Sequence, residues 1–85
     1  MRKATLKERA LLARALRAWR GPRLPGARRA CMRPTRYDRD QLAIGVSVER
    51  EHTSSPVLAL EIAQAHLCER RDYYAKLERM ERSRR

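Results

Sequence analysis

Long apolar runs, internal repeats and glycine-rich phosphate loops are all missing from this chain of 85 residues. A helix that spans a membrane needs about 18 consecutive apolar residues, so we expect no membrane span. A chain this short buries only about 60% of the surface of its unfolded form, which makes a deep enzyme pocket difficult to build. These absences exclude a transmembrane protein, a repeat protein and a multidomain enzyme.

Cysteine is also scarce. Cys31 and Cys68 are the only two, and they are too few and too far apart in the sequence to suggest a disulfide framework or a metal knuckle. The composition therefore fits a reduced, intracellular setting, and we expect a cytoplasmic location.

Positive charge is abundant and unevenly placed. Residues 1–36 hold twelve Lys or Arg and one acid, for a net charge of +11, whereas residues 37–85 hold nine of each sign and are neutral. Such an asymmetry indicates a polyanionic partner for the basic part, because charge patterning reports on association rather than on fold. The sequence thus predicts a basic arm over residues 1–36, followed by a compact helical domain over residues 37–82.

The basic arm begins with helix signals. Thr5 and Glu8 have the spacing of a capping box, and Leu12, Leu16 and Trp19 then form an apolar stripe at helical intervals. We predict an amphipathic helix over about residues 5–19. The prolines and glycines of residues 21–36 predict an extended linker after it.

The rest of the chain predicts three short helices, which makes the fold class all-α. Asp38 or Asp40 can cap the first, Ser55 with Pro56 can start the second at about residue 57, and Asp72 can cap the third. We expect the second helix to bury a face that includes Leu58, Ala59, Ile62, Ala63 and His66. The predicted core consists of Leu42, Val46, Val48, Leu58, Ile62, Leu67, Tyr73, Leu77 and Met80.

Three short motifs resemble a known family. They are Glu51-His52-Thr53, Ala63-x-x-His66-Leu67 and Asp72-Tyr73-Tyr74. Over about residues 38–81 the chain is similar to an uncharacterised family, a domain of unknown function found in small proteins of bacteriophages and bacteria. The resemblance implies a compact helical domain, and it implies no activity. We expect a cytoplasmic location, or association with the virion if the protein is phage-encoded. The basic arm lies outside the resemblance.

Two helical pairs of ionisable residues suggest a metal site. Glu49 and His52, and likewise His66 and Glu69, are three residues apart and so share a helix face. In an antiparallel hairpin the two histidines would lie roughly 15 Å apart, which is too far for one metal ion. We therefore predict no metal and no cofactor, and we expect a polar network instead, with a mostly buried His66. Its candidate members are Glu49, Glu51, His52, His66, Glu69 and Asp72.

Enzyme activity is not expected. Cys68 and His66 are two residues apart and do not share a helix face, so they do not form a nucleophile and base pair. No other constellation suggests catalysis, and no small-molecule substrate is indicated.

Non-specific binding of nucleic acid is the function that the charge favours, because cations that neutralise phosphates release counterions. Nothing suggests sequence readout or a choice between DNA and RNA. Trp19 can stack on an exposed base, or it can simply dock the first helix on the body. The predicted phosphate contacts are Arg2, Lys3, Lys7, Arg9, Arg14, Arg17, Arg20, Arg23, Arg28, Arg29, Arg33 and Arg36.

Other interpretations of residues 1–36 stay open. The first helix can dock in a groove of a larger protein or nucleoprotein assembly, and a metal-binding helical domain is a further alternative. An Arg-rich beginning also resembles an organelle transit peptide, although no serine precedes Ser47. Finally, Met32 can be the true start, in which case most of the excess positive charge disappears.

Overall fold

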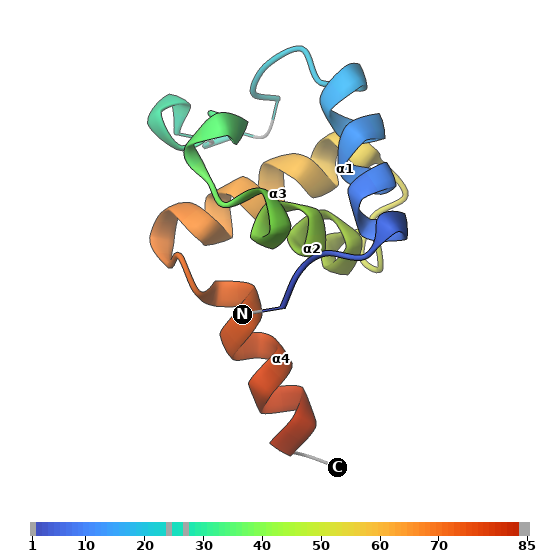
Figure 1. Ribbon diagram of the computed structural model, residues 1–85. Coiled ribbons are helices and arrows are strands. Elements are labelled where there is room, and N and C mark those ends of the chain that lie inside the picture. The colour runs from blue at the N-terminus through green and yellow to red at the C-terminus, as the bar shows by residue number, and fades with distance from the viewer. Residues whose placement is uncertain (1, 24, 27, 84–85) are drawn as a thin grey trace.

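The computed structural model of the protein describes residues 2–23, 25–26 and 28–83. These residues form four α-helices, two short 3-10 helices and no strand, so the predicted all-α class is confirmed. Figure 1 shows three of the α-helices packed together, with the last one extending from them. In chain order the elements are α1 (Leu6–Ala18), η1 (Arg29–Cys31), η2 (Pro34–Arg36), α2 (Arg39–Glu49), α3 (Pro56–Glu69) and α4 (Tyr73–Ser83).

Three of the predicted caps are confirmed. The Thr5 hydroxyl accepts a hydrogen bond from the backbone N–H of Glu8, whose carboxylate accepts one from the N–H of Thr5, which completes a capping box. The side chain of Asp38 caps α2, and that of Ser55 caps α3, with Pro56 in the first turn. Each cap satisfies a backbone N–H that has no partner inside the helix.

Helix α1 is part of the core. It packs against both α2 and α3, and its residues Leu12 and Ala15 are almost fully buried. The apolar stripe predicted from the sequence is therefore already covered by this chain's own helices, and a polypeptide that began at Met32 would leave a gap in the core. The fully or largely buried core residues are Ala4, Leu12, Ala15, Leu42, Ala43, Ile44, Val46, Ala59, Leu60, Ala63, Leu67 and Tyr74.

The buried face of α3 differs from the predicted one. Leu58 and Ile62 are only half-buried, whereas Leu60 and the polar residues Glu61 and Gln64 are buried. The reason is that α3 lies between several elements, with α1, α2 and η1 all in contact with it. A helix enclosed in this way buries more than one stripe, so its apolar periodicity does not identify a single inner face.

Helix α4 leaves the body after its first turn (Figure 1). Tyr74 in that turn is completely buried, but Met80 is 49% exposed. The prediction that Met80 belongs to the core is therefore wrong, because Met80 lies on the part of α4 that extends away from the three packed helices. Val48, Tyr73 and Leu77 are partly buried and pack against the core, and Leu58 and Ile62 are half-buried.

Gly45 of α2 makes room for the Tyr74 ring. A Cβ atom at this position would lie 2.5 Å from Cε2 and 2.9 Å from Cζ of Tyr74, and 3.0 Å from Cβ of Ala63. We therefore expect Gly45→Ala to lower the free energy of unfolding by about 1–2 kcal/mol, since crowding of a rigid buried ring outweighs the gain in helix propensity. Urea unfolding measures this. Ser47→Ala in the same helix is the control, with an expected change of less than about 0.5 kcal/mol; equal effects of the two substitutions would refute the prediction.

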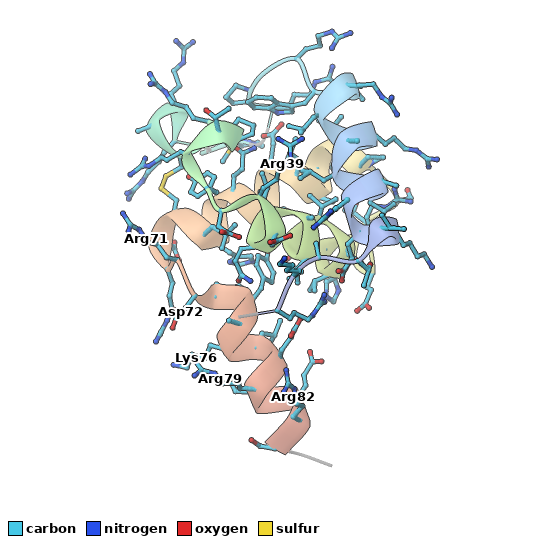
Figure 2. All side chains as sticks on the ribbon, viewed as in Figure 1. Arg39, Arg71, Asp72, Lys76, Arg79 and Arg82 are labelled. Atoms are coloured by element: carbon cyan, nitrogen blue, oxygen red, sulfur yellow. A yellow bond between two sulfur atoms is a disulfide. The ribbon has the colours of Figure 1, made fainter. Side chains whose placement is uncertain are left out.

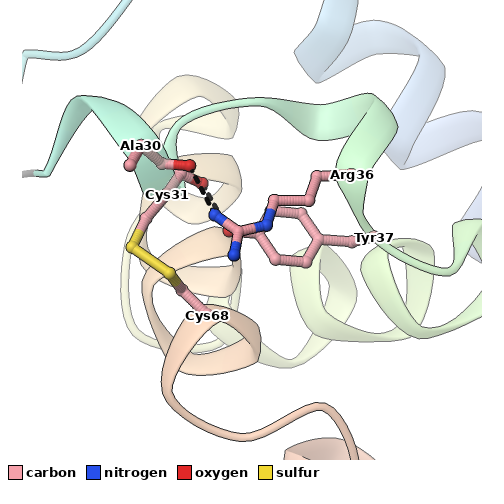
Figure 3. The surroundings of a disulfide bond; sticks show 5 residues. All are labelled: Ala30, Cys31, Arg36, Tyr37 and Cys68. Atoms are coloured by element: carbon pink, nitrogen blue, oxygen red, sulfur yellow. Dashed lines mark hydrogen bonds between the residues drawn. A yellow bond between two sulfur atoms is a disulfide. The ribbon is translucent and has the colours of Figure 1, made fainter.

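The segment after α1 is not the extended linker that the sequence predicted. It contains η1 and η2, and a disulfide bond joins Cys31 of η1 to Cys68 near the end of α3 (Figure 3). The expectation that these cysteines form no disulfide is wrong. Their separation of 37 residues says little about distance, because the chain folds back and places the two Cα atoms 5.5 Å apart.

Two hydrogen bonds support the disulfide. The Tyr37 hydroxyl donates to the Cys31 carbonyl over 2.6 Å, and Nη1 of Arg36 donates to the Ala30 carbonyl over 2.7 Å (Figure 3). The prolines and glycines that exclude long helices here still permit 3-10 turns, whose ends are held by these contacts.

Among the described helices, none has the length and apolar character required to cross a bilayer.

Candidate nucleic-acid interface

The outer face of α1 carries a row of cations. The α1 stripe, as we call Lys7, Arg14 and Arg17, is exposed to solvent, while the opposite face of the helix packs on the body. Within the described part of the chain these three side chains form no ion pair. At a rise of about 1.5 Å per residue, the ten residues from Lys7 to Arg17 cover roughly 15 Å of the helix axis. The stripe can therefore contact more than one phosphate of a nucleic-acid strand.

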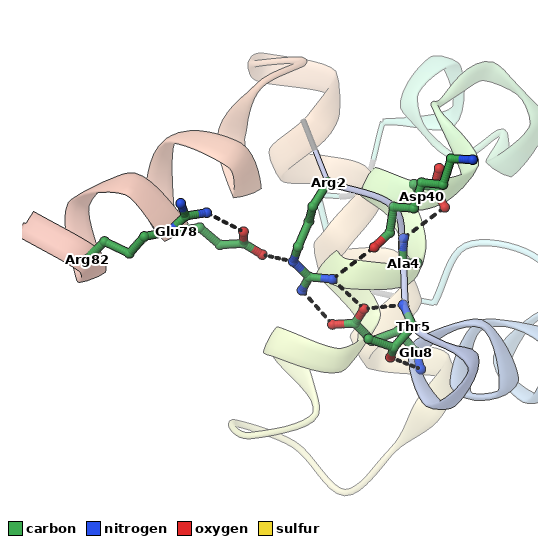
Figure 4. Close-up of polar contacts among 8 residues, drawn as sticks. Arg2, Ala4, Thr5, Glu8, Asp40, Glu78 and Arg82 are labelled. Atoms are coloured by element: carbon green, nitrogen blue, oxygen red, sulfur yellow. Dashed lines mark hydrogen bonds and ion pairs between the residues drawn. The ribbon is translucent and has the colours of Figure 1, made fainter.

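Arg2 does not belong to this free charge. Its guanidinium forms an ion pair with Glu8 at 2.7 Å and another with Glu78 of α4 at 2.8 Å (Figure 4). These carboxylates raise the pKa of Arg2 and leave it little capacity for a phosphate. Arg9 lies 3.7 Å from Asp40, whose Oδ1 also accepts a hydrogen bond from the backbone N–H of Ala4. The residues before α1 are thus attached to α2 and α4.

The Arg2 and Glu8 pair makes stability depend on acidic pH. Hydrogen bonding from Arg2 is the main cause that lowers the pKa of Glu8 from 4.5 to about 2. A carboxyl whose pKa is lowered in the folded state stabilises the fold above pH 4.5, and this contribution disappears as the pH falls toward 2. Partial exposure limits the effect to below about 1 kcal/mol. Unfolding of Glu8→Gln, measured between pH 5 and 2, should therefore depend less steeply on pH than that of the parent; identical slopes would contradict this.

The segment between α1 and α2 supplies a second set of cations. Arg23, Arg28, Arg29 and Arg33 are exposed, and so are Lys3 and Arg20 on either side of α1. Arg20 donates hydrogen bonds to the carbonyls of Arg17 and Trp19, and Arg36 donates to Ala30. These contacts to carbonyls position the side chains without neutralising their charge. Figure 1 shows this segment at the end of the body opposite the free end of α4, with α1 along the flank of the body.

Trp19 docks against the core. Its indole N–H donates a hydrogen bond to Oε2 of Glu61 over 3.2 Å, and its ring packs at the edge of the core cluster. The Glu61 carboxylate is completely buried and also accepts the backbone N–H of Arg23 over 2.9 Å. Of the two uses that the sequence suggested for Trp19, the structure shows the docking of α1, and stacking on a base stays a prediction.

Part of the predicted polar network exists. The Tyr74 hydroxyl donates to Oε2 of Glu49 over 2.8 Å, and Nε2 of His66 lies 3.7 Å from the same oxygen. The imidazole stacks on the Tyr73 ring, with centroids 4.2 Å apart. Burial, and then the nearby Glu49 carboxylate, raise the pKa of Tyr74, which therefore stays a neutral donor. His66 is more open than predicted, since 34% of its side chain is exposed.

The other predicted members lie elsewhere. Glu51, His52 and Glu69 are exposed, and Asp72 lies 2.9 Å from Nε of Arg70 and 3.9 Å from Nη2 of Arg79. The hydrogen bond from Arg70 lowers the pKa of Asp72. Among residues 2–23, 25–26 and 28–83, no three His, Cys, Asp or Glu side chains come close enough together to hold a metal ion.

Sequence reasoning missed three charged residues that matter here. Glu61 is an acid within an otherwise apolar run of α3, and that interruption is the signal that marks it as a buried partner. Arg39 and Arg71, labelled in Figure 2, are exposed cations of residues 37–85, and they lie at the same end of the body as segment 28–36. The overall neutrality of residues 37–85 concealed them, because a net charge does not show where each charge lies.

Comparison with known proteins extends the family resemblance. No curated protein and no solved structure matches the chain. The match to a family model covers residues 9–83, so it includes most of α1 and the whole segment between α1 and α2, which the sequence analysis left outside the resemblance. This extent agrees with the packing of α1 in the core. The chain belongs to the family described as protein of unknown function (DUF5661).

Proposed function

We propose that this protein binds nucleic acid through phosphate contacts, without catalysis and without reading the base sequence. The observation that carries the proposal is the outward row of unpaired cations on α1, continued by the arginines of segment 20–36. The one acid of residues 1–36, Glu8, is engaged by Arg2 and by the capping box. This surface therefore keeps a strong positive charge, which attracts a polyanion.

The packing of the apolar side of α1 against the body also supports the proposal. Docking of this helix into a groove of another protein would require Leu12, Leu16 and Trp19 to be available. Leu12 is buried, and Leu16 and Trp19 pack against the body. The stripe of Leu12, Leu16 and Trp19 is therefore engaged within this chain, whereas the cations of α1 are exposed to a partner. The proposal includes a small accessory protein of a bacterium or phage. The location expected from the sequence, the cytoplasm or a virion, rested in part on unpaired cysteines, and the disulfide removes that argument for the cytoplasm.

Salt dependence tests the proposal directly. A labelled random-sequence DNA and an RNA of equal length are titrated with the protein between about 50 and 200 mM salt, with fluorescence anisotropy as the readout. Each phosphate contact contributes about 0.9 to the slope of log affinity against log salt for duplex DNA. A slope of several units is expected. Absence of binding at 50 mM salt, or affinity that does not change with salt, would overturn the proposal.

Matched variants then locate the interface. Replacing Lys7, Arg14 and Arg17 together by alanine removes three charges from α1, and the expected loss of affinity at 50 mM salt is at least about tenfold. The control replaces Lys76, Arg79 and Arg82 by alanine, which removes three charges from the opposite end of the molecule. We expect less than about a threefold loss for the control. Equal losses would show that net charge alone, rather than the α1 stripe, determines binding.

A further inference from the structure

A pocket lies beside the disulfide, between residues 36–38 and the C-terminal turn of α3. Figure 3 shows Arg36, Tyr37 and Cys68, which contribute to its lining. Its volume of about 310 Å³ falls at the lower end of the range for small-molecule sites. Two cations, one carboxylate, one aromatic ring and one buried amide line it, contributed by Arg36, Arg71, Asp38, Tyr37 and Gln41. Neither the family description nor the proposed phosphate surface on α1 assigns a role to it.

The amide of Gln41 indicates what is missing from the pocket. Gln41 is 2% exposed, and its Oε1 atom is buried without a hydrogen-bond partner among the described residues. A buried acceptor without a partner is costly, and an N–H or O–H group of a ligand would satisfy it. The pocket is therefore suited to a molecule that has both an anionic group and hydrogen-bond donors.

The two arginines supply the anionic part of the recognition. Arg36 uses only Nη1 for the Ala30 carbonyl, so its other N–H groups can donate to a ligand. Arg71 is exposed and forms no ion pair within the described part of the chain. A pair of guanidinium groups is well matched to phosphate oxygens, because their planar forks allow several parallel hydrogen bonds.

The remaining groups suit a nucleoside. The Tyr37 ring offers an aromatic surface of the kind on which bases stack, and Asp38 has an oxygen beyond the one that caps α2, which can accept a ribose hydroxyl. The Gln41 amide forms part of the pocket wall, and its unpartnered oxygen is an acceptor for which an N–H group of a base is a suitable donor. The disulfide and the hydrogen bond from Tyr37 to Cys31 hold these groups in place before any ligand arrives.

We infer that this pocket binds one nucleotide unit, a nucleoside monophosphate or a terminal nucleotide of a strand. Arg36 and Arg71 contact its phosphate, and Tyr37, Asp38 and Gln41 contact its nucleoside. The choice of a nucleotide over other anions rests on the proposed function. The pocket adds to the proposed function a second position, at which a single nucleotide is recognised. This position is separate from the α1 stripe, which contacts the phosphates of a strand.

Adenosine monophosphate and inorganic phosphate are the probes. Each is titrated into ¹⁵N-labelled, oxidised protein at about 150 mM salt, and the amide shifts of residues 36–41 and 67–71 are followed. We expect saturable binding of the nucleotide at these amides, at least about tenfold tighter than that of phosphate. Arg71→Ala should weaken nucleotide binding about tenfold, because it removes a charge-assisted contact. Lys76→Ala on α4 is the matched control, since it removes an exposed cation outside both the pocket and the α1 stripe, and it should leave nucleotide binding unchanged.

The outcomes separate this inference from the proposed function. If random DNA binds with a steep salt dependence but the nucleotide does not bind, the pocket assignment is wrong and the phosphate surface stands. If the nucleotide binds but DNA does not, the proposed function fails and the pocket survives. Phosphate that binds as tightly as the nucleotide, or equal losses from Arg71→Ala and Lys76→Ala, would overturn the assignment of a nucleotide site.

Discussion

Replacing Cys68 by serine is expected to lower the free energy of unfolding by about 3–4 kcal/mol in the absence of reducing agent. The disulfide between Cys31 and Cys68 spans 37 residues, and a cross-link of that span removes a large amount of loop entropy from the unfolded chain. The effect is large for so short a chain, because small domains have only about 5–15 kcal/mol of total stability. Urea unfolding of the parent and of Cys68→Ser, followed by circular dichroism, measures the difference.

Reduction of the parent provides the control for this prediction. In dithiothreitol the parent should unfold at nearly the same urea concentration as Cys68→Ser, since both then lack the cross-link. Cys31→Ser should match Cys68→Ser, and the double variant should cost no more than either single one, because all three remove one bond. If the oxidised and reduced parent unfold at the same urea concentration, the disulfide does not stabilise the protein and the prediction is refuted.

The disulfide also shows where sequence reasoning stopped. Helix limits and caps depend on neighbours in the chain, so Thr5, Asp38 and Ser55 could be assigned as caps from the sequence, and the structure confirms them. Pairing of Cys31 with Cys68 depends on how the segment after α1 returns to α3. No local pattern encodes that return, and the sequence interpretation of two unrelated cysteines was wrong.

The sequence prediction for the positive charge was partly right, because one part of it depended only on local periodicity. Exposed cations on one face of α1 follow from helical periodicity, which is a local property. Arg2, however, was counted with them, although its guanidinium binds Glu8 and also Glu78, which is 76 residues away in the chain. Ion pairs between distant segments cannot be obtained from a charge count. The candidate interface therefore includes fewer cations than the sequence indicated, and it is limited to the α1 stripe and to the exposed cations beside α1 and between α1 and α2.

Buried polar residues account for the remaining differences. The sequence predicted that α3 would bury Leu58 and Ile62, yet Glu61 and Gln64 are inside. A carboxylate is buried only where donors compensate for the loss of water, and the donors for Glu61 are in the segment that follows α1. His66, by contrast, was correctly grouped with Glu49 in a polar network, and its ring also stacks on Tyr73.

Glu61→Ala is expected to destabilise the protein by about 2–4 kcal/mol. The substitution removes the acceptor for the indole N–H of Trp19 and for the backbone N–H of Arg23, and it leaves both donors without that partner near the core. Each unsatisfied buried donor costs about 1–3 kcal/mol. The cavity left by the buried side chain adds to the loss. Glu61→Gln, which keeps an acceptor oxygen and nearly the same volume, should lose less than Glu61→Ala.

Trp19 provides the readout, because it is the only tryptophan in the chain. Its fluorescence should shift to longer wavelength in Glu61→Ala under native conditions, as the ring loses its contact with α3 and becomes more hydrated. Glu69→Ala is the matched control: it removes an exposed acid from the same helix, and we expect a change in stability below about 0.5 kcal/mol and no spectral shift. If the two alanine variants unfold at the same urea concentration and have the same emission spectrum, Glu61 does not anchor α1, and the cationic surface must be positioned by the core contacts of Leu12 and Ala15 and by the disulfide.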